Sequence, residues 1–552
     1  MPNRNERARA LMCCLGLVFC VGALFGRVVW HPFIAFDDAE FILRNPQVTS
    51  PTSSLVNLLL TPKTGYVIPV TVAFEALLYG ISRGQAWAFH AAAVALHALF
   101  ACQLWALSRR LGTDWRWALA GTLLFAVHPL VLQPVAWAIC IKDLLMANFT
   151  LAGTHAFLAA SDDTPRRGAG VVAVALAFLA MLAKPSAALV GFAWLAHLLA
   201  RKLADSRPAR PAGTPLRAAL ATALLGGLVG AASRYSHDTL LNDAAVPWSP
   251  WKPVEVLGRQ LAHLLWPADL LIAYSDPVIE PAPWLRALGL AAALLTGYAL
   301  IRLRAAPALL LPLALALATY VPTSNALPFA RTMSDSYMYV PLAGVSLLIA
   351  AALDTWVAGR APIVQRLAAA TVLIAALALA TSTSAQLPRW RGGSALWDPV
   401  ITRYPRLATA HRLMGDEMVF RGHPDRAVEP YRRAFALDYD PRFLLEYGTV
   451  LSMAGRLPDA ECVLIEAVAF GSNGGYAVYN YAALLSFNAG YSPRYPGVAR
   501  QLLKRLDGLR AAGKVQWPSA LEPGLKTQLD RVRDAAPPPS WPQRNCRMLR
   551  RE

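Results

Sequence analysis

Residues 36–46, FDDAEFILRNP, place two adjacent carboxylates, Asp37 and Asp38, a few residues after the first long apolar run. A carboxylate within hydrogen-bond reach of an attacking hydroxyl group can accept its proton as a general base. Repulsion between two neighbouring acids can tune one of them for that task. Alternatively, either acid caps the short helix that AEFIL suggests. The sequence favours a catalytic acid here but does not separate Asp37 from Asp38.

Further titratable side chains lie where other apolar runs end. They are His90 and His97, His128, Lys142 and Asp143, Lys184, and Arg331 and Asp335. Taken singly, each has a structural explanation as a packing histidine, a helix-end anchor or a snorkelling lysine. Charges at membrane depth are nevertheless costly and rarely kept without a role. Taken together, these acids and bases predict a site at the water–lipid boundary, polar enough for a sugar and deep enough to meet a lipid.

The elements expected to position these residues are membrane-spanning helices. Hydrophobic residues make up 56% of the 552 residues and charged residues only 16%. Apolar runs of about 17 to 25 residues can cross a hydrocarbon core as helices. About eleven spans are predicted, at 11–30, 86–107, 117–130, 136–159, 168–183, 186–200, 218–232, 286–302, 307–321, 338–353 and 367–384. The fold class is therefore all-α, with a polytopic bundle over residues 1–385.

The net charge of +18 is concentrated in alternate loops of this bundle and does not indicate nucleic acid. With the N-terminus in the cytoplasm, the loops SRRLGTDWR, DDTPRR, RKLADSRPARPAGTPLR, IRLR and GRAPIVQR also face the cytoplasm. This is the positive-inside pattern, and it places all the candidate site residues on the outer side. A cleaved signal peptide at 11–30 is the alternative, but no small-residue cleavage site follows the run.

The C-terminal part reads as a helical repeat. Gly415 and Gly448, Gly422 and Gly455, Ala427 and Ala460, and Ala434 and Ala467 are each 33 residues apart. This period, with small residues at these offsets, is typical of tetratricopeptide repeats (TPRs). We expect a TPR solenoid over 386–515, with a third unit from about residue 479, and a Pro-rich, loosely ordered tail over 516–552. The solenoid predicts partner binding, with a spacer or dimerisation element as the alternative.

The cysteine and tryptophan residues give less information about function. No His/Cys spacing fits a zinc site, and His90 with His97 is a weak candidate for metal binding. Five cysteines lie in or beside spans as packing residues, whereas Cys462 and Cys546 fall in the outer domain, where pairing is conceivable. Trp248, Trp251 and Trp266 are expected in an aromatic belt.

Six stretches in order resemble the TMTC-type O-mannosyltransferases, a family of GT-C fold membrane enzymes with C-terminal TPRs, and their bacterial homologues. They are FDDAEFILRNPQV, YVIPVTVAFEALLYG with AFHAAAVALHALF, LFAVHPLVLQPVAWAICIKDLLMANF, MLAKPSAA, LLWPADLLIAY and SDSYMYVPLAG. The resemblance implies sugar transfer from a polyprenyl-phosphate carrier to a hydroxyl of a protein on the outer face of a bacterial inner membrane. It implies no certain cofactor and leaves metal dependence open.

The resemblance also implies roles for the candidate residues. Asp37 or Asp38 would be the base. Lys184 and Arg331, with Lys142 behind them, would meet the leaving phosphate, and His90, His128, Asp143 and Asp335 would line the site. Four positions depart from the family pattern: Val131 stands for His, Gln133 for Glu, Ile141 for Arg, and Ser336 for the Arg beside Asp335. Arg331, four residues before Asp335, is the available substitute for that lost cation.

Two other functions fit the same sequence. A non-catalytic envelope scaffold would use the bundle as an anchor and the repeats to bind partners. A transferase acting on lipid-linked glycan would keep the core chemistry with another acceptor. A transporter is disfavoured, because its charged site would lie at the midplane of the bilayer.

Overall fold

The structure is a computed structural model that describes residues 4–50, 67–162, 164–204, 213–241, 249–268, 270–276, 281–327, 331–440 and 443–470. It divides into two compact units, Met1–Leu396 and Trp397–Glu552, close to the predicted boundary at 385. All regular elements within the described ranges are helical, as predicted. The expected boundary at 515 and the third repeat lie outside them.

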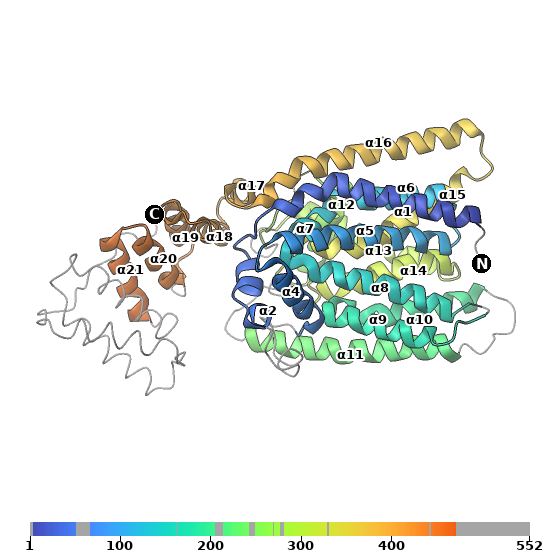
Figure 1. Cartoon of the computed structure of the whole chain (residues 1–552), viewed down its shortest axis with the longest axis horizontal. Coiled ribbons are helices and arrows are strands. Elements are labelled where there is room, and N and C mark those ends of the chain that lie inside the picture. Colours follow the sequence, from blue (N-terminus) through green and yellow to red (C-terminus); the bar gives the residue numbers. More distant parts are fainter. Residues whose placement is uncertain are drawn as a thin grey trace, which may run out of the picture. The chain divides into compact units, whose positions relative to one another are not determined.

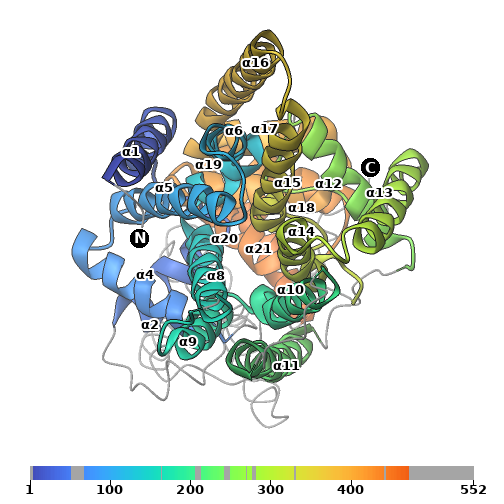
Figure 2. The same ribbon diagram turned by 90° about the vertical axis from the view of Figure 1, so that its right-hand side faces the viewer.

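The first unit has a helix at each stretch expected to cross the membrane, and these helices run side by side along its length (Figure 1). They are α1 (Arg4–Phe25), α5 (Trp87–Arg110), α6 (Trp115–Ala126), α8 (Ile141–Ala160), α9 (Ala169–Ala183), α10 (Val190–Ala204), α11 (Gly213–Leu241), α13 (Pro283–Arg302), α14 (Pro307–Tyr320), α15 (Tyr339–Val357) and α16 (Pro362–Gln386). Figure 2 views the unit from one end.

Seven helical stretches of the described chain are long and apolar enough to cross a membrane, or eight if α6 and the bent segment after it form one span. The others are shorter or less apolar, such as α9 and α14. The first unit is thus a helical membrane bundle, with fewer spans satisfying length and composition than the predicted eleven.

Shorter helices connect the long ones. They are η1 (Gly26–Trp30), the π-helical turn η2 (Ala39–Leu43), α2 (Pro46–Thr49), α4 (Pro69–Ser82), η3 (Pro129–Val131), α7 (Leu132–Ala136), η4 (Ala138–Cys140), η5 (Pro185–Leu189), α12 (Lys252–Leu265), η6 (Val321–Thr323), η7 (Asp335–Met338) and η8 (Leu387–Arg391). A sharp break follows α6, where the helix axis bends by 58°. Such irregular backbone is tolerated at membrane depth only where protein covers it. Accordingly, residues 128–141 are all buried.

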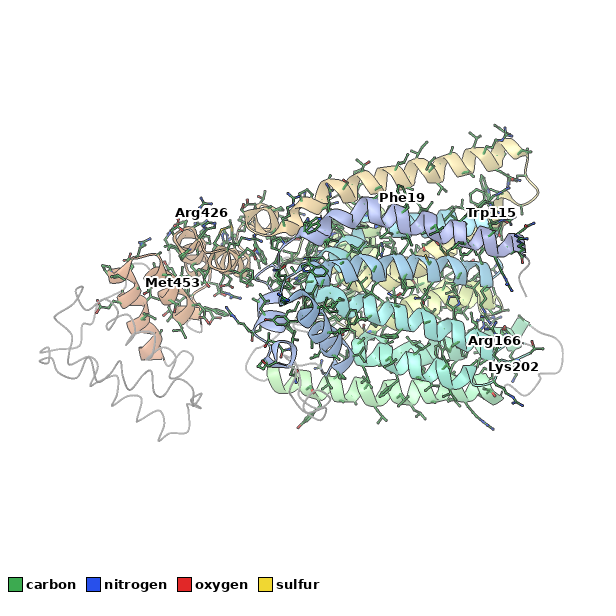
Figure 3. All side chains as sticks on the ribbon, in the orientation of Figure 1. Phe19, Trp115, Arg166, Lys202, Arg426 and Met453 are labelled. Atoms are coloured by element: carbon green, nitrogen blue, oxygen red, sulfur yellow. The ribbon has the colours of Figure 1, made fainter. Side chains whose placement is uncertain are left out.

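The side-chain distribution fits a membrane setting. Trp115, Arg166 and Lys202 lie at one end of the first unit, whereas Phe19 projects outward partway along α1 (Figure 3). Phe19, Leu224 and Leu294 are each at least 71% exposed. In water such apolar surface would be unfavourable, but against hydrocarbon it is not.

Close helix packing depends on glycine where α12 and α13 cross. A Cβ on Gly258 would lie 1.9 Å from the Leu285 carbonyl oxygen, and one on Gly289 would lie 1.9 Å from that of Val254. Both obstacles are backbone atoms, so neither helix can yield by turning a side chain. This contact fixes α12, which carries part of the candidate site.

The second unit contains two successive helix pairs, preceded by α17 (Ser394–Arg403), in which the division between the units falls. The pairs are α18 (Ala408–Phe420) with α19 (Pro424–Leu437), and α20 (Leu444–Met453) with α21 (Leu457–Phe470). A Cβ on Gly415 would meet the Tyr431 ring at 2.5 Å, and one on Gly448 would meet Leu464 at 2.6 Å. The predicted offset of 33 residues therefore recurs in the packing of both pairs.

We expect Gly289→Ala to destabilise the protein, because the added methyl group would collide with the α12 backbone. Overpacking of this kind costs about 1–3 kcal/mol. Gly297→Ala is the matched control on the same helix, since nothing lies within 4 Å of its added Cβ. Thermal unfolding of the detergent-solubilised protein measures both. Equal melting temperatures for the two variants would contradict the close approach.

Candidate active site

Chain direction brings most of the predicted residues to one end of the first unit. Lys142 and Asp143 occupy the first turn of α8, and Lys184 directly follows α9, which packs antiparallel to α8. Arg331 and Asp335 precede α15, which begins at the same end. The charges of Asp143, Lys142, Lys184 and Arg331 all act on the Cys140 thiol, which places them around one point.

The two adjacent acids have different surroundings. Asp37 has a left-handed backbone (φ 64°), a sparsely populated conformation for a residue other than glycine. Its side chain is 25% exposed, and Oδ2 lies 3.5 Å from Nη1 of Arg331. Asp38 is 1% exposed, and its carboxylate accepts the N–H groups of Ile34 (3.1 Å) and Ile139 (3.0 Å). Asp37 is thus the accessible acid, whereas Asp38 ties the loop after η1 to η4.

The burial of Asp38 also argues against a role as the base, because the hydroxyl group of an acceptor cannot reach an enclosed carboxylate. Burial raises the pKa of Asp38 well above its usual range, which the two backbone hydrogen bonds partly offset. The nearby charges of Asp37 and Glu75 raise this pKa further. Glu75, on α4, is itself fully buried, and the sequence analysis did not single it out. Its only signal was a carboxylate within the apolar stretch YVIPVTVAFEALLYG.

Arg331 is held by aromatic rings. Its guanidinium carbon lies 5.0 Å from the Phe36 ring centroid and 4.9 Å from that of Trp137, and these two rings stack on each other. Its Nη2 donates to the Ile272 carbonyl oxygen at 2.9 Å. These contacts aim Arg331 at Asp37. Such cation–π contacts suit a guanidinium better than an ammonium.

Arg331 does not fill the predicted place beside Asp335. Asp335 instead accepts hydrogen bonds from Nδ1–H of His263 (3.2 Å) and from the Tyr274 hydroxyl (2.6 Å). Neither partner was foreseen, because α12 and the segment after it are remote in sequence. Asp335 therefore belongs to a neighbouring polar group and shares no ion pair with Arg331.

Asp143 and Lys184 form a buried ion pair. Lys184 also lies over the Tyr337 ring, 4.9 Å from its centroid. A cavity of about 10 Å³ adjoins the pair, and Ser186 and Ser336 help to line it. This is room for about one water molecule. Asp143 Oδ2 and the Ser186 hydroxyl have no protein partner there, so such a water would satisfy both.

Lys142 differs from Lys184 and Arg331, which both form ion pairs with carboxylates. It is partly exposed, lies 5.5 Å from the Phe41 ring centroid, and forms no ion pair within the described part of the chain. A cation in this setting can bind an incoming anion without first breaking a salt bridge.

The three predicted histidines have structural partners. Nδ1 of His128 accepts the Leu130 N–H at 3.1 Å, and its Nε2–H donates to the Leu264 carbonyl oxygen at 3.2 Å. His97 bonds Tyr339 and the α6 backbone, and His90 packs against His31. Across the ranges that the structure describes, no group of three His, Cys, Asp or Glu side chains could hold a metal ion.

Two of the departures from the family pattern contact each other. Gln133 Oε1 accepts the Ser336 backbone N–H (2.9 Å) and the Ser334 hydroxyl (3.1 Å). All three residues are buried. A neutral hydrogen-bonded group thus joins α7 to η7. Ile141, another departure, is fully buried at the start of α8.

Two of the three tryptophans predicted for an aromatic belt are exposed in the structure. Trp251 and Trp266 are exposed by 49% and 77%, whereas Trp248 lies outside the described residues.

Comparisons with protein-family models, with curated proteins and with solved structures found no match to this chain.

We expect Asp38→Asn to unfold more easily than the wild type. An asparagine amide would turn an N–H₂ group toward one of the two backbone N–H donors, which loses a buried hydrogen bond worth about 1–3 kcal/mol. Asp37→Asn is the matched control, because that side chain is partly exposed. Thermal unfolding in detergent would show a lower melting temperature for Asp38→Asn alone. An unchanged melting temperature for Asp38→Asn would refute its anchoring role.

We expect Lys184→Met to cost about 3–5 kcal/mol of stability, because it leaves the buried Asp143 carboxylate without its cation. The double variant Asp143→Asn/Lys184→Met removes both charges and should recover most of that loss. Chemical denaturation in detergent micelles measures the three proteins. If the double variant were as unstable as Lys184→Met, the pair would not be coupled.

Proposed function

We propose that this protein is a membrane glycosyltransferase. It moves a sugar, such as mannose or another hexose, from a polyprenyl-phosphate carrier to a hydroxyl group of a protein acceptor. The observation that carries this proposal is one accessible carboxylate, Asp37, aligned with Arg331 at the end of a membrane bundle. Three cations, Lys142, Lys184 and Arg331, lie around Cys140. The rings of Phe36 and Trp137 hold the Arg331 guanidinium group.

In this mechanism Asp37 is the general base. The acceptor oxygen forms a bond to the anomeric carbon while the bond from that carbon to the phosphate oxygen breaks. The acceptor proton passes to Asp37 Oδ, and the bonding electrons leave with the polyprenyl phosphate. Arg331, whose Nη1 lies 3.5 Å from Asp37 Oδ2, orients this carboxylate before the reaction. Because attack and departure lie on opposite sides, the configuration at the anomeric carbon inverts.

The departing phosphate requires positive charge. Lys142 is the best placed cation, because it has no carboxylate partner in the described structure. Lys184 is neutralised by Asp143 and acts mainly as a positioning residue. Preorganised cations at a developing anion lower the barrier more than cations that must first move into place.

The remaining features support an outward-facing enzyme of the TMTC type. Basic residues gather at the opposite end of the bundle, as the positive-inside pattern requires for a cytoplasmic N-terminus. Cys462 in the second unit is disulfide-bonded, which suits an oxidising compartment such as a bacterial periplasm. The two helix pairs would then begin a TPR solenoid that presents the acceptor.

A non-catalytic scaffold is the second candidate. The neutral group of Gln133, Ser334 and Ser336 favours it, since these residues bond to one another through Gln133 Oε1 and offer no charge to a substrate. In that case the helix pairs of the second unit would supply the function.

We expect Asp37→Asn to abolish sugar transfer while folding and membrane insertion remain intact. Glu40→Gln is the control, because Glu40 is a nearby carboxylate that is 63% exposed and lies outside the site. Intact-mass analysis of envelope proteins from a deletion strain complemented with each variant is the measurement. A hexose-sized mass should be absent with Asp37→Asn and present with Glu40→Gln.

The scaffold predicts another outcome. Asp37→Asn would then behave as the wild type, and removal of the second unit would produce the deletion phenotype.

A further inference from the structure

A second hollow lies between α6 and α16, at the end of the bundle opposite the candidate active site. Its volume is about 440 Å³, within the range of ligand-binding sites. Its lining is Arg116, Trp117, Leu119, Ala120 and Leu123 from α6, with Pro362, Gln365, Arg366, Ala369, Val372, Leu373 and Ala376 from α16. Both views place α16 at the outer edge of the bundle (Figures 1 and 2), so this groove faces the surroundings of the bundle.

The groove is polar at one end only. Arg116 and Arg366 both lie near the N-termini of their helices, and both are exposed. Neither forms an ion pair with any residue that the structure describes. The N-terminus of α16 adds partial positive charge near Arg366, whereas the N-terminus of α6 is capped by the Asp114 carboxylate.

Two carboxylates near this end of the groove, Asp114 and Asp354, each accept a backbone hydrogen bond. Asp114 caps α6 by accepting the Arg116 backbone N–H at 3.0 Å. Asp354 on α15 accepts the Asp114 backbone N–H at 2.9 Å. Neither belongs to the groove lining. The groove lining therefore contains Arg116 and Arg366 and no acidic residue, while the Asp114 carboxylate lies outside the lining at the N-terminus of α6.

The apolar part of the groove matches one leaflet in length. Beyond Arg366, the lining residues on α16 extend to Ala376, a rise of about 15 Å at 1.5 Å per residue. Half of a hydrocarbon core is also about 15 Å. Leu119, Leu123, Val372 and Leu373 supply apolar contact along this distance. An amphiphile with an anionic head and one chain of leaflet length fits both ends.

We propose that this groove binds an anionic phospholipid, with its phosphate at Arg116 and Arg366 and an acyl chain between α6 and α16. A second copy of the chain fits less well, because it would bring the same basic end against these arginines. The carrier lipid of the proposed reaction has its phosphate at the opposite end of the bundle. The inference therefore does not depend on the proposed function.

The test uses the full chain in phosphatidylcholine vesicles that contain a small fraction of photoactivatable phosphatidylglycerol. After illumination, labelled peptides are identified by mass spectrometry, with photoactivatable phosphatidylcholine as the neutral probe. We expect phosphatidylglycerol to label α6 and α16. Arg116→Gln and Arg366→Gln should each reduce that labelling about fivefold, as expected for one basic residue near anionic lipid. Arg166→Gln is the control, an exposed arginine at the same end that does not line the groove.

A second variant separates the groove from simple surface charge. Ala369→Trp keeps both arginines but fills the groove, and it should also abolish labelling of α6 and α16 while the melting temperature stays unchanged. Equal labelling by the two lipids, or labelling indifferent to these substitutions, would overturn the proposal. So would cross-linked dimers joined through α16 in place of lipid adducts.

Discussion

The bundle depends on one constraint, the need to satisfy backbone polar groups wherever a helix breaks at membrane depth. Between α6 and α8 the chain makes several short turns, and side chains both within this segment and remote from it accept hydrogen bonds from free backbone amides. Asp38 accepts the Ile139 N–H, and His128 accepts that of Leu130. Gln133 serves the same purpose toward η7 by accepting the Ser336 N–H. Without these bonds the turns would expose unpaired donors, and the residues at the start of α8 would lose their position.

Because of this constraint, enclosed and partly exposed charged residues lie close together at this end of the bundle. Asp38 and the Asp143–Lys184 pair are enclosed and hold backbone or each other. Asp37 and Lys142 stay partly exposed. The enclosed groups give the exposed ones a rigid support, and a rigid support is what preorganised catalysis requires. Substitutions of the enclosed groups should therefore lower stability, whereas substitutions of the partly exposed groups should lower activity.

Opposite ends of the bundle carry different chemistry. The candidate active site combines acids with cations and suits a reaction in which a proton moves and a phosphate leaves. The groove between α6 and α16 offers cations alone beside an apolar channel, which suits binding without reaction. Both use the fact that helix ends meet the polar boundary of a bilayer, where a charged group and an apolar chain can be bound together.

Composition and periodicity alone determined the helical class, the membrane setting and the pairing of helices at an offset of 33 residues, because apolar runs and small-residue repeats are local signals. Because chain direction alternates between successive spans, the sequence also predicted that most of the site residues lie at one end of the bundle. Only the tertiary structure separated Asp37 from Asp38, gave Asp335 the partners His263 and Tyr274, and brought Gln133 to Ser336. Those outcomes depend on which remote backbone amide or side chain comes within about 3 Å. No pattern along the chain encodes such a distance.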